Sequence, residues 1–158
     1  TKDSLSTFFY PASGVIFKNH KVLVDACLKL KEDGINDYKV IFTLNGDENK
    51  HIAEIYNIVK ENQLPIKFVG SMKRDEVFKL YTESVLLFPS FIETVGLPLV
   101  EAQLHNTPII ATDCSYSLEI LSGYEKVDFF RYNSESQLIE LIKKSLGKSE
   151  LLIIEHFS

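Results

Sequence analysis

The sequence has few of the residues that build disulfide frameworks or metal sites. It contains no tryptophan, one methionine and two cysteines in 158 residues. Cys27 and Cys114 are far apart, and Cys27 lies on the apolar face of a helical pattern. Two such thiols form neither a disulfide framework nor a metal-ligand cluster, which indicates reduced cysteines in a cytosolic protein.

Long apolar runs and basic clusters are missing as well. No apolar run approaches the roughly 18 residues that a membrane span needs. The N-terminal residues 1–4 include a lysine, an aspartate and a serine, and they contain no apolar core of a signal peptide. The formal net charge is −5, and the lysines and arginines do not gather into a stripe. We therefore expect no transmembrane segment and no nucleic-acid partner.

Histidine is scarce too, and its spacing predicts no metal site. The four histidines do not fall at metal-ligand distances from cysteines or acidic residues. Each is predicted to be a surface or helix-end side chain; these residues are His20, His51, His105 and His156.

Six apolar runs alternate with helical patterns along the chain. The predicted strands cover residues 7–10, 39–44, 66–69, 85–88, 108–111 and 126–130, and the predicted helices cover 19–31, 47–62, 74–82, 97–105 and 117–121. A capping box at 134–137 opens a further helix. This alternation predicts a Rossmann-like three-layer α/β/α fold over a single domain, residues 1–158. Its six-stranded parallel sheet should have the order 3-2-1-4-5-6.

This strand order locates a ligand crevice before any motif is considered. In open α/β sheets, ligands bind beyond the carboxyl ends of the strands where the order reverses, here between strands 1 and 4. The loop after the first strand covers residues 11–18, and the loop after the fourth covers residues 90–97. We expect these two loops to form the site.

The chain is organised around the stretch that runs from Phe88 to Glu101. Pro98 suits the first position of a helix, because the missing N–H would be unpaired there anyway. The free N–H groups of that helix start make a site for phosphate. Glu93 and Glu101 flank this position, and carboxylates would repel an anion. They are therefore predicted to bind the hydroxyl groups of a sugar.

A family resemblance rests on the same stretch. The string Pro89-Ser90-x-x-Glu93-x-x-Gly96-Leu97-Pro98-x-x-Glu101-Ala102, followed by Pro108-Ile-Ile-Ala-Thr-Asp113, resembles the signature of retaining GT-B-fold glycosyltransferases of family 4, also called group 1. In that family this region is the C-terminal, donor-binding half of the fold. The sequence has no initiator methionine and stops as an apolar segment begins. We therefore expect an excised domain whose N-terminal acceptor domain is absent.

The resemblance implies roles for residues around the helix start. Glu93 would act in catalysis by contacting the donor sugar, and Glu101 would accept hydrogen bonds from the ribose hydroxyls. A carboxylate suits a cis-diol because it offers two acceptor oxygens. Backbone N–H groups of residues 94–97 would bind the diphosphate and the sugar; these residues are Thr94, Val95, Gly96 and Leu97.

Further roles implied by the resemblance fall on two other loops. Lys18 would act in catalysis by neutralising the leaving diphosphate. Ser13, beside Gly14, stands where many members of the family have an arginine, and both residues belong to the expected donor site. Met72, just after the third strand, lies in the region that contacts the nucleotide base, largely through its backbone.

Each of these roles has a structural alternative. Glu93 could cap loop N–H groups, and Glu101 could only complement the helix dipole. Residues 94–97 could be a plain strand-to-helix turn. Lys18 could simply be solvated.

The implied reaction is transfer of a sugar from a UDP- or GDP-sugar to an acceptor hydroxyl, with the anomeric configuration retained. The resemblance also implies a place in surface polysaccharide or glycan biosynthesis, no metal and no other cofactor. The sequence shows no metal-binding Asp-x-Asp pair. We expect a cytoplasmic protein whose full-length form could lie at the inner face of the membrane. The fragment alone should be inactive, because acceptor binding belongs to the other half.

Two alternatives from other classes stay open. A GT-B-fold nucleotide-sugar epimerase would need acid and base groups around the sugar, and this half shows only the two glutamates. A non-enzymatic flavodoxin-like module, such as a receiver, would need clustered aspartates after the first strand. Residues 11–14 contain none.

Overall fold

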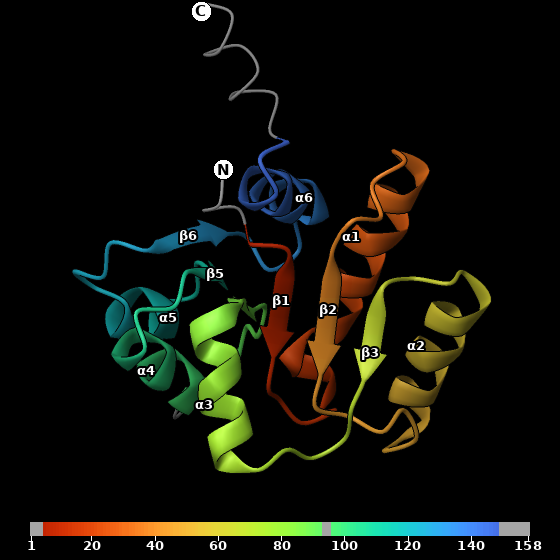
Figure 1. Cartoon of the computed structure of the whole chain (residues 1–158), viewed down its shortest axis with the longest axis horizontal. Coiled ribbons are helices and arrows are strands. Elements are labelled where there is room, and N and C mark those ends of the chain that lie inside the picture. Colours follow the sequence, from red (N-terminus) through yellow and green to blue (C-terminus); the bar gives the residue numbers. More distant parts are fainter. Residues whose placement is uncertain (1–4, 93–95, 149–158) are drawn as a thin grey trace, which may run out of the picture.

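The computed structural model describes residues 5–92 and 96–148, and a six-stranded parallel sheet forms its centre (Figure 1). The sheet order is β3-β2-β1-β4-β5-β6, and each neighbouring pair is parallel. The predicted fold class and strand order are confirmed. The strands are β1 (Thr7–Tyr10), β2 (Lys39–Phe42), β3 (Ile66–Phe68), β4 (Val85–Phe88), β5 (Ile109–Thr112) and β6 (Val127–Phe130).

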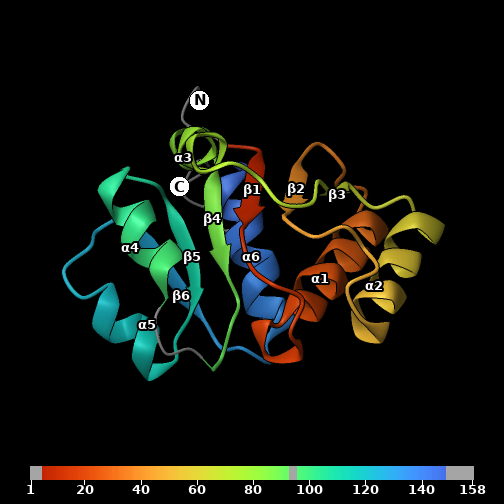
Figure 2. The ribbon, with the colours of Figure 1, turned by 90° about the horizontal axis from the view of Figure 1, so that it is seen from below.

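Helices cover both faces of the sheet and complete the three layers (Figure 2). The helices α1, α2 and α6 lie on one face, where α1 packs against α6, and α3, α4 and α5 lie on the other. Within residues 5–92 and 96–148, no helix combines the length and the apolar character needed to span a bilayer. The helices are α1 (His20–Glu32), α2 (Lys50–Glu61), α3 (Arg74–Glu83), α4 (Leu97–Leu104), α5 (Ser115–Ile120) and α6 (Glu135–Ser145), and a short 3₁₀ helix η1 (Ile16–Lys18) precedes α1.

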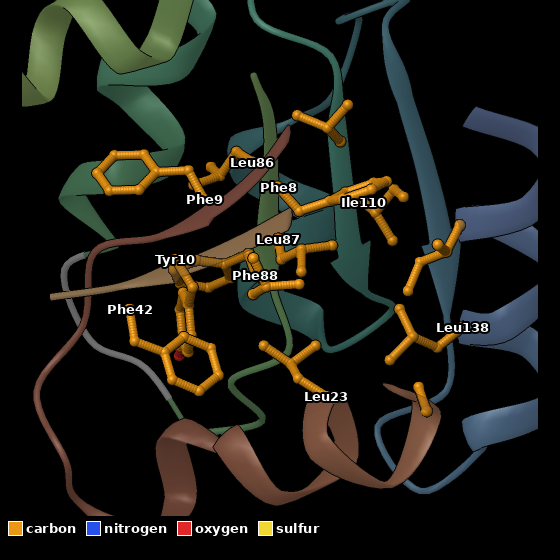
Figure 3. Close-up of a cluster of buried hydrophobic side chains, with 14 of the residues drawn as sticks. Phe8, Phe9, Tyr10, Leu23, Phe42, Leu86, Leu87, Phe88, Ile110 and Leu138 are labelled. Atoms are coloured by element: carbon orange, nitrogen blue, oxygen red, sulfur yellow. The ribbon is translucent and has the colours of Figure 1, made fainter. Parts of the chain in front are cut away.

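The central strands are buried on both faces, as their nearly unbroken apolar sequences predict. Phe8, Phe9 and Tyr10 of β1 are fully buried. Successive side chains of a strand point to opposite faces, so Phe9 points away from Phe8 (Figure 3). Phe9 meets the ring of Tyr81 from α3, whereas Tyr10 meets the ring of His20 from α1. The core therefore ties the first residues of α1 and the last turn of α3 to the same strand.

The predicted bounds of β1 and β4 match residue for residue, but the start of α2 was placed three residues too early. Helix α2 begins at Lys50 rather than at residue 47. The Glu48 carboxylate accepts hydrogen bonds from the N–H groups of Asn45 and Gly46, which holds this segment in a turn. Asn49 then caps the helix by accepting from the N–H of Ile52 at 2.8 Å. Hydrogen bonds between these side chains and nearby backbone groups therefore place the start of α2 at Lys50.

The predicted capping box of α6 is only half formed. The Ser134 hydroxyl accepts from the N–H of Gln137 at 3.3 Å, as predicted. The Gln137 side chain, however, accepts from the N–H of Arg131 at 2.8 Å instead of returning to the cap residue. The predicted start of α6 is confirmed, but the predicted hydrogen bond from the Ser134 N–H to the Gln137 side chain is not formed.

His20 is a helix-end residue, one of the two predicted alternatives, and it is buried rather than at the surface. His20 is the first residue of α1, but it is only 1% exposed and lies between the rings of Tyr10 and Phe42. Asn19 adopts a left-handed conformation with φ 65°, and the chain turns there into the helix. Burial lowers the pKa of His20 to about 3, with nearby His51 adding to the effect.

Candidate functional site

The loops after β1 and β4 meet, as the topology predicted. The backbone N–H of Phe91 donates to the carbonyl oxygen of Phe17 at 3.4 Å, and the Ser90 hydroxyl donates to the same oxygen at 3.4 Å. The Asn19 side-chain amide donates to the carbonyl oxygen of Pro89 at 2.9 Å. These three contacts join segments some 70 residues apart at the carboxyl ends of the two central strands.

Lys18 ends the 3₁₀ helix η1 rather than beginning α1, because the left-handed Asn19 separates the two elements. The Tyr10 hydroxyl donates to the Lys18 carbonyl oxygen at 2.7 Å, which ties the loop to the end of β1. The Lys18 ammonium nitrogen lies 5.7 Å from the ring centre of Phe17. Lys18 therefore belongs to the loop that contacts the segment after β4.

Helix α4 begins at Leu97, as predicted, and Gly96 is its N-cap. Gly96 has φ 54°, a left-handed conformation that glycine adopts without steric cost. A Cβ atom added to Gly96 would lie 2.2 Å from a ring carbon of Tyr116. Both the backbone conformation and the packing of Tyr116 therefore require glycine here. Pro98 is the second residue of α4 rather than the first, and it still lies in the first turn, where its missing N–H would be unpaired.

Glu101 lies in α4, one turn beyond its start, and both of its carboxylate oxygens have partners. The Tyr81 hydroxyl donates to Oε1 at 3.0 Å, and the Arg74 guanidinium donates to Oε2 at 3.1 Å. The side chain of Glu101 is 13% exposed, whereas that of Arg74 is 70% exposed. Burial raises the pKa of the Tyr81 hydroxyl, and the neighbouring Glu101 carboxylate raises it further. The tyrosine thus stays a hydrogen-bond donor at physiological pH.

Aromatic rings pack around Tyr81, the buried partner of Glu101. Tyr81 is 1% exposed, and its ring contacts those of Phe9 and His105 at centroid distances of 5.8 and 5.5 Å. His105 Nδ1 lies 2.8 Å from the Glu101 carbonyl oxygen, so it also ties α4 to this cluster. Because Tyr81 is packed on several sides, the position of its hydroxyl is well determined.

A pocket of about 390 Å³ opens between α3 and α4, and we call it the α3–α4 pocket. Its walls bring together Met72, Leu97 and Glu101, three of the predicted donor-binding residues. Carboxylate oxygens and a guanidinium lie beside apolar walls, a combination typical of sites for small organic ligands. The lining residues are Pro11, Met72, Arg74, Val77, Phe78, Tyr81, Leu97, Pro98 and Glu101.

Among the described residues, the predicted site residues Ser13, Gly14, Lys18 and Gly96 do not line this pocket. Ser13 is exposed in the loop after β1. Gly14 is buried, and its carbonyl oxygen accepts from the Asn49 side-chain amide at 2.9 Å. The predicted sites Glu93, Thr94 and Val95 lie outside the described residues.

Arg74, Phe78 and Tyr81 also line this pocket, although no sequence motif gave them a role. Their spacing of four and three residues places them on one face of α3. That spacing is the signal that could have found them. What the sequence did not show is that this face meets Glu101, which follows Tyr81 by 20 residues.

A larger pocket of about 590 Å³ lies at the amino ends of the strands, opposite the α3–α4 pocket. The first residues of three strands line it, namely Val85, Ile109 and Val127. Ligands of open α/β sheets bind beyond the other ends of the strands. In the part of the chain that the structure describes, no three histidine, cysteine or acidic side chains gather as a metal site would need.

The fold is that of a doubly wound α/β domain, and the α3–α4 pocket lies near its switch point. A family model for the group 1 glycosyl transferases matches residues 2–152. The chain therefore belongs to the group 1 glycosyl transferases.

A curated relative and several solved structures resemble the chain. An uncharacterized 41.2 kDa protein in the cps region of Klebsiella pneumoniae is 30% identical over 105 residues, which are 66% of this chain and 28% of that protein. A glycosyltransferase from Rickettsia africae has a TM-score of 0.77 at 19% identity, covering 94% of this chain and 40% of its own. HepE from Anabaena, in complex with UDP and glucose, has a TM-score of 0.75 at 16% identity, covering 96% and 43%.

Because the sequence identities to the solved structures are low, these likenesses show a shared fold and nothing about function. The shared fold agrees with the likeness to GT-B glycosyltransferases that the motif suggested. The chain spans less than half the length of each of these three relatives.

Proposed function

We propose that the α3–α4 pocket binds the nucleoside of a UDP- or GDP-sugar and that this chain is the donor-binding half of a retaining family 4 glycosyltransferase. The observation that carries the proposal is the Glu101 carboxylate at the pocket wall, fixed by Tyr81 and only 13% exposed. A fixed carboxylate offers two acceptor oxygens at the spacing of a cis-diol, which suits the ribose hydroxyls.

The neighbouring groups suit the other parts of such a ligand. Met72 and Pro11 give the pocket apolar walls against which a nucleotide base can pack. The backbone N–H groups at the start of α4, beyond Gly96, suit the diphosphate. Glu93 would contact the sugar, as the motif implies.

The proposed reaction moves the sugar from the nucleotide to an acceptor hydroxyl with retention of anomeric configuration. Negative charge develops on the diphosphate as the bond to the sugar breaks. Lys18 and the helix N–H groups would stabilise that charge, without a metal. The acceptor would bind to an N-terminal domain outside this sequence. The 158-residue chain alone should therefore bind the donor without transferring its sugar.

The relatives favour particular ligands and a particular setting. Structures of the Anabaena protein contain UDP with glucose in one case and UDP-glucose in another, which makes UDP-sugars the first candidates. The Klebsiella relative is encoded in a cps region, which favours surface polysaccharide biosynthesis. We propose a cytoplasmic enzyme on this basis, since nucleotide sugars are made in the cytoplasm.

Ligand-observed NMR with UDP-, GDP- and ADP-sugars tests the proposal. The chain should bind one of them, and Glu101→Ala should weaken that binding by about tenfold, equivalent to about 1.4 kcal/mol. The affinity of Glu101→Gln should lie between those of the parent chain and Glu101→Ala, because glutamine keeps one acceptor oxygen. Glu140→Ala, an exposed glutamate of α6, is the matched control and should change nothing.

Thermal melting of each variant separates lost binding from lost folding. Unchanged binding by a folded Glu101→Ala variant would contradict the ribose assignment. No binding of any nucleotide sugar by the folded parent chain would contradict the proposed function itself.

A further inference from the structure

Arg74 lies in the α3–α4 pocket and contacts the group assigned to the ribose. Its guanidinium donates to Glu101 Oε2 at 3.1 Å, and its central carbon lies 5.0 Å from the ring centre of Phe78. Phe78 and Glu101 both line the same pocket. The guanidinium therefore lies at the pocket wall, although most of the Arg74 side chain is exposed to solvent.

The two partners of Glu101 differ in how firmly they are held. Tyr81 is buried and packed among aromatic rings, so its hydroxyl stays beside Oε1. Arg74 is 70% exposed at the first residue of α3. Exposed ion pairs contribute little, because water and salt compete with them. Tyr81 can thus fix the carboxylate alone, while the contact with Arg74 can be exchanged.

We propose that Arg74 occupies the ribose subsite of the nucleotide-free protein and that the ribose diol must displace it. This inference rests on the proposed function. The guanidinium has donors only, so it cannot accept a hydrogen bond from a ribose hydroxyl. Arg74 lines the pocket and takes up an acceptor site of Glu101 Oε2 there, so a ribose hydroxyl that approaches Oε2 from the pocket competes with the guanidinium. Arg74 therefore lowers the affinity for ribonucleotides and is a specificity-determining residue of the donor site.

The size of the effect follows from the weakness of an exposed ion pair. Releasing such a pair shifts a binding equilibrium by about two- to fivefold. Arg74→Ala should therefore tighten ribonucleotide binding by that factor. A ligand without the diol makes no hydrogen bond to Glu101 Oε2, so Arg74→Ala should not give its affinity this two- to fivefold increase.

The experiment compares UDP with 2′,3′-dideoxy-UDP, which carries the same base and diphosphate without the hydroxyls. Dissociation constants are measured by calorimetry for the parent chain and for Arg74→Ala, Arg74→Gln and Lys73→Ala. The readout is the ratio of the dideoxy-UDP constant to the UDP constant. In this ratio, any general effect of losing a positive charge on diphosphate binding cancels.

The ratio should rise about two- to fivefold for both Arg74 variants. Arg74→Gln keeps the side-chain stem over Phe78, so it separates charge from packing. Lys73→Ala removes an exposed neighbouring charge that does not line the pocket, and it should leave the ratio unchanged.

The outcomes separate this inference from the function on which it rests. A parent ratio above one that neither Arg74 variant raises would overturn the role of Arg74 alone. A parent ratio of one would overturn the ribose assignment and, with it, the inference. Failure of the folded parent to bind UDP, GDP or ADP would overturn the proposed function.

Discussion

Helices α1 and α4 follow the two central strands, yet His20 of α1 and Glu101 of α4 are held in opposite ways. Glu101 of α4 has a hydrogen-bond donor on each carboxylate oxygen and lines a pocket. His20 of α1 is 1% exposed, and its Nε2 atom has no hydrogen-bond partner within residues 5–92 and 96–148.

The difference distinguishes a binding group from a packing group. A buried charge is stable only when it is paired, and the Glu101 carboxylate has Tyr81 as a buried partner and Arg74 as an exposed, exchangeable one. The imidazole of His20 avoids that cost by remaining neutral, because burial lowers its pKa to about 3. A charged group with an exchangeable partner can take up a ligand, whereas a neutral ring between two aromatic rings supports the fold.

The largest effect is expected where α4 begins. Gly96→Ala would place a methyl group 2.2 Å from the Tyr116 ring at a φ of 54°. The left-handed conformation and the overpacking together should cost about 2–5 kcal/mol of unfolding free energy, measured by chemical denaturation. Binding to the α3–α4 pocket should weaken with it, because α4 carries Glu101.

Gly123→Ala is the matched control for this change. Gly123 also has a positive φ, 83°, but an added Cβ would meet nothing within 4 Å. Its cost should be about 1–2 kcal/mol, from the backbone conformation alone. Equal costs at the two glycines would show that Tyr116 does not press on the start of α4.

The next effect concerns His20 and depends on pH. The folded pKa of about 3 lies below the ordinary value of 6.5, so above pH 6.5 the ring is neutral in both states. As the pH falls below 6.5, the unfolded chain takes up a proton that the folded chain does not. This group should therefore cost about 3 kcal/mol of stability between pH 8 and pH 4.5.

His20→Phe should remove this part of the pH dependence while keeping a ring between Tyr10 and Phe42. Denaturation of parent and variant at several pH values between 4.5 and 8 measures it. The same replacement at His105 is the control, and it should leave the slope in place. A slope that survives in His20→Phe would show that other groups cause it.

The smallest effect tests the fixed partner of Glu101. Tyr81→Phe removes the hydroxyl that donates to Oε1, which should cost about 1.5 kcal/mol of stability, as for hydrogen bonds to charged groups. UDP binding should weaken as well, because the carboxylate loses its fixed partner. Tyr124→Phe removes a hydroxyl that donates to the Thr107 carbonyl oxygen at 2.6 Å. This control should lower stability without changing UDP binding.

The sequence was sufficient for the fold because each strand is a short apolar run between turn signals. The bounds of β1 and β4 follow from their aromatic and aliphatic residues, and the strand order follows from the alternation with helices. The meeting of the loops after β1 and β4 follows from that order. The start of α4 was predictable because Gly96 and Pro98 are specific signals.

The details that could not be predicted depend on contacts between distant residues. Nothing near His20 in sequence shows that Tyr10 and Phe42 enclose it. The partners of Glu101 lie 20 and 27 residues earlier, on another helix, so no local pattern pairs them. The roles of Lys18 and Glu93 stay predictions.

The most direct test of the account is an amide NMR titration of the chain with UDP. The account predicts that the largest shift changes fall on Met72 and on residues from Gly96 to Glu101, with small changes around His20. Saturable binding that instead shifts the amide resonances of residues in the pocket at the amino ends of the strands, such as Lys126 and Asp128, would contradict the account.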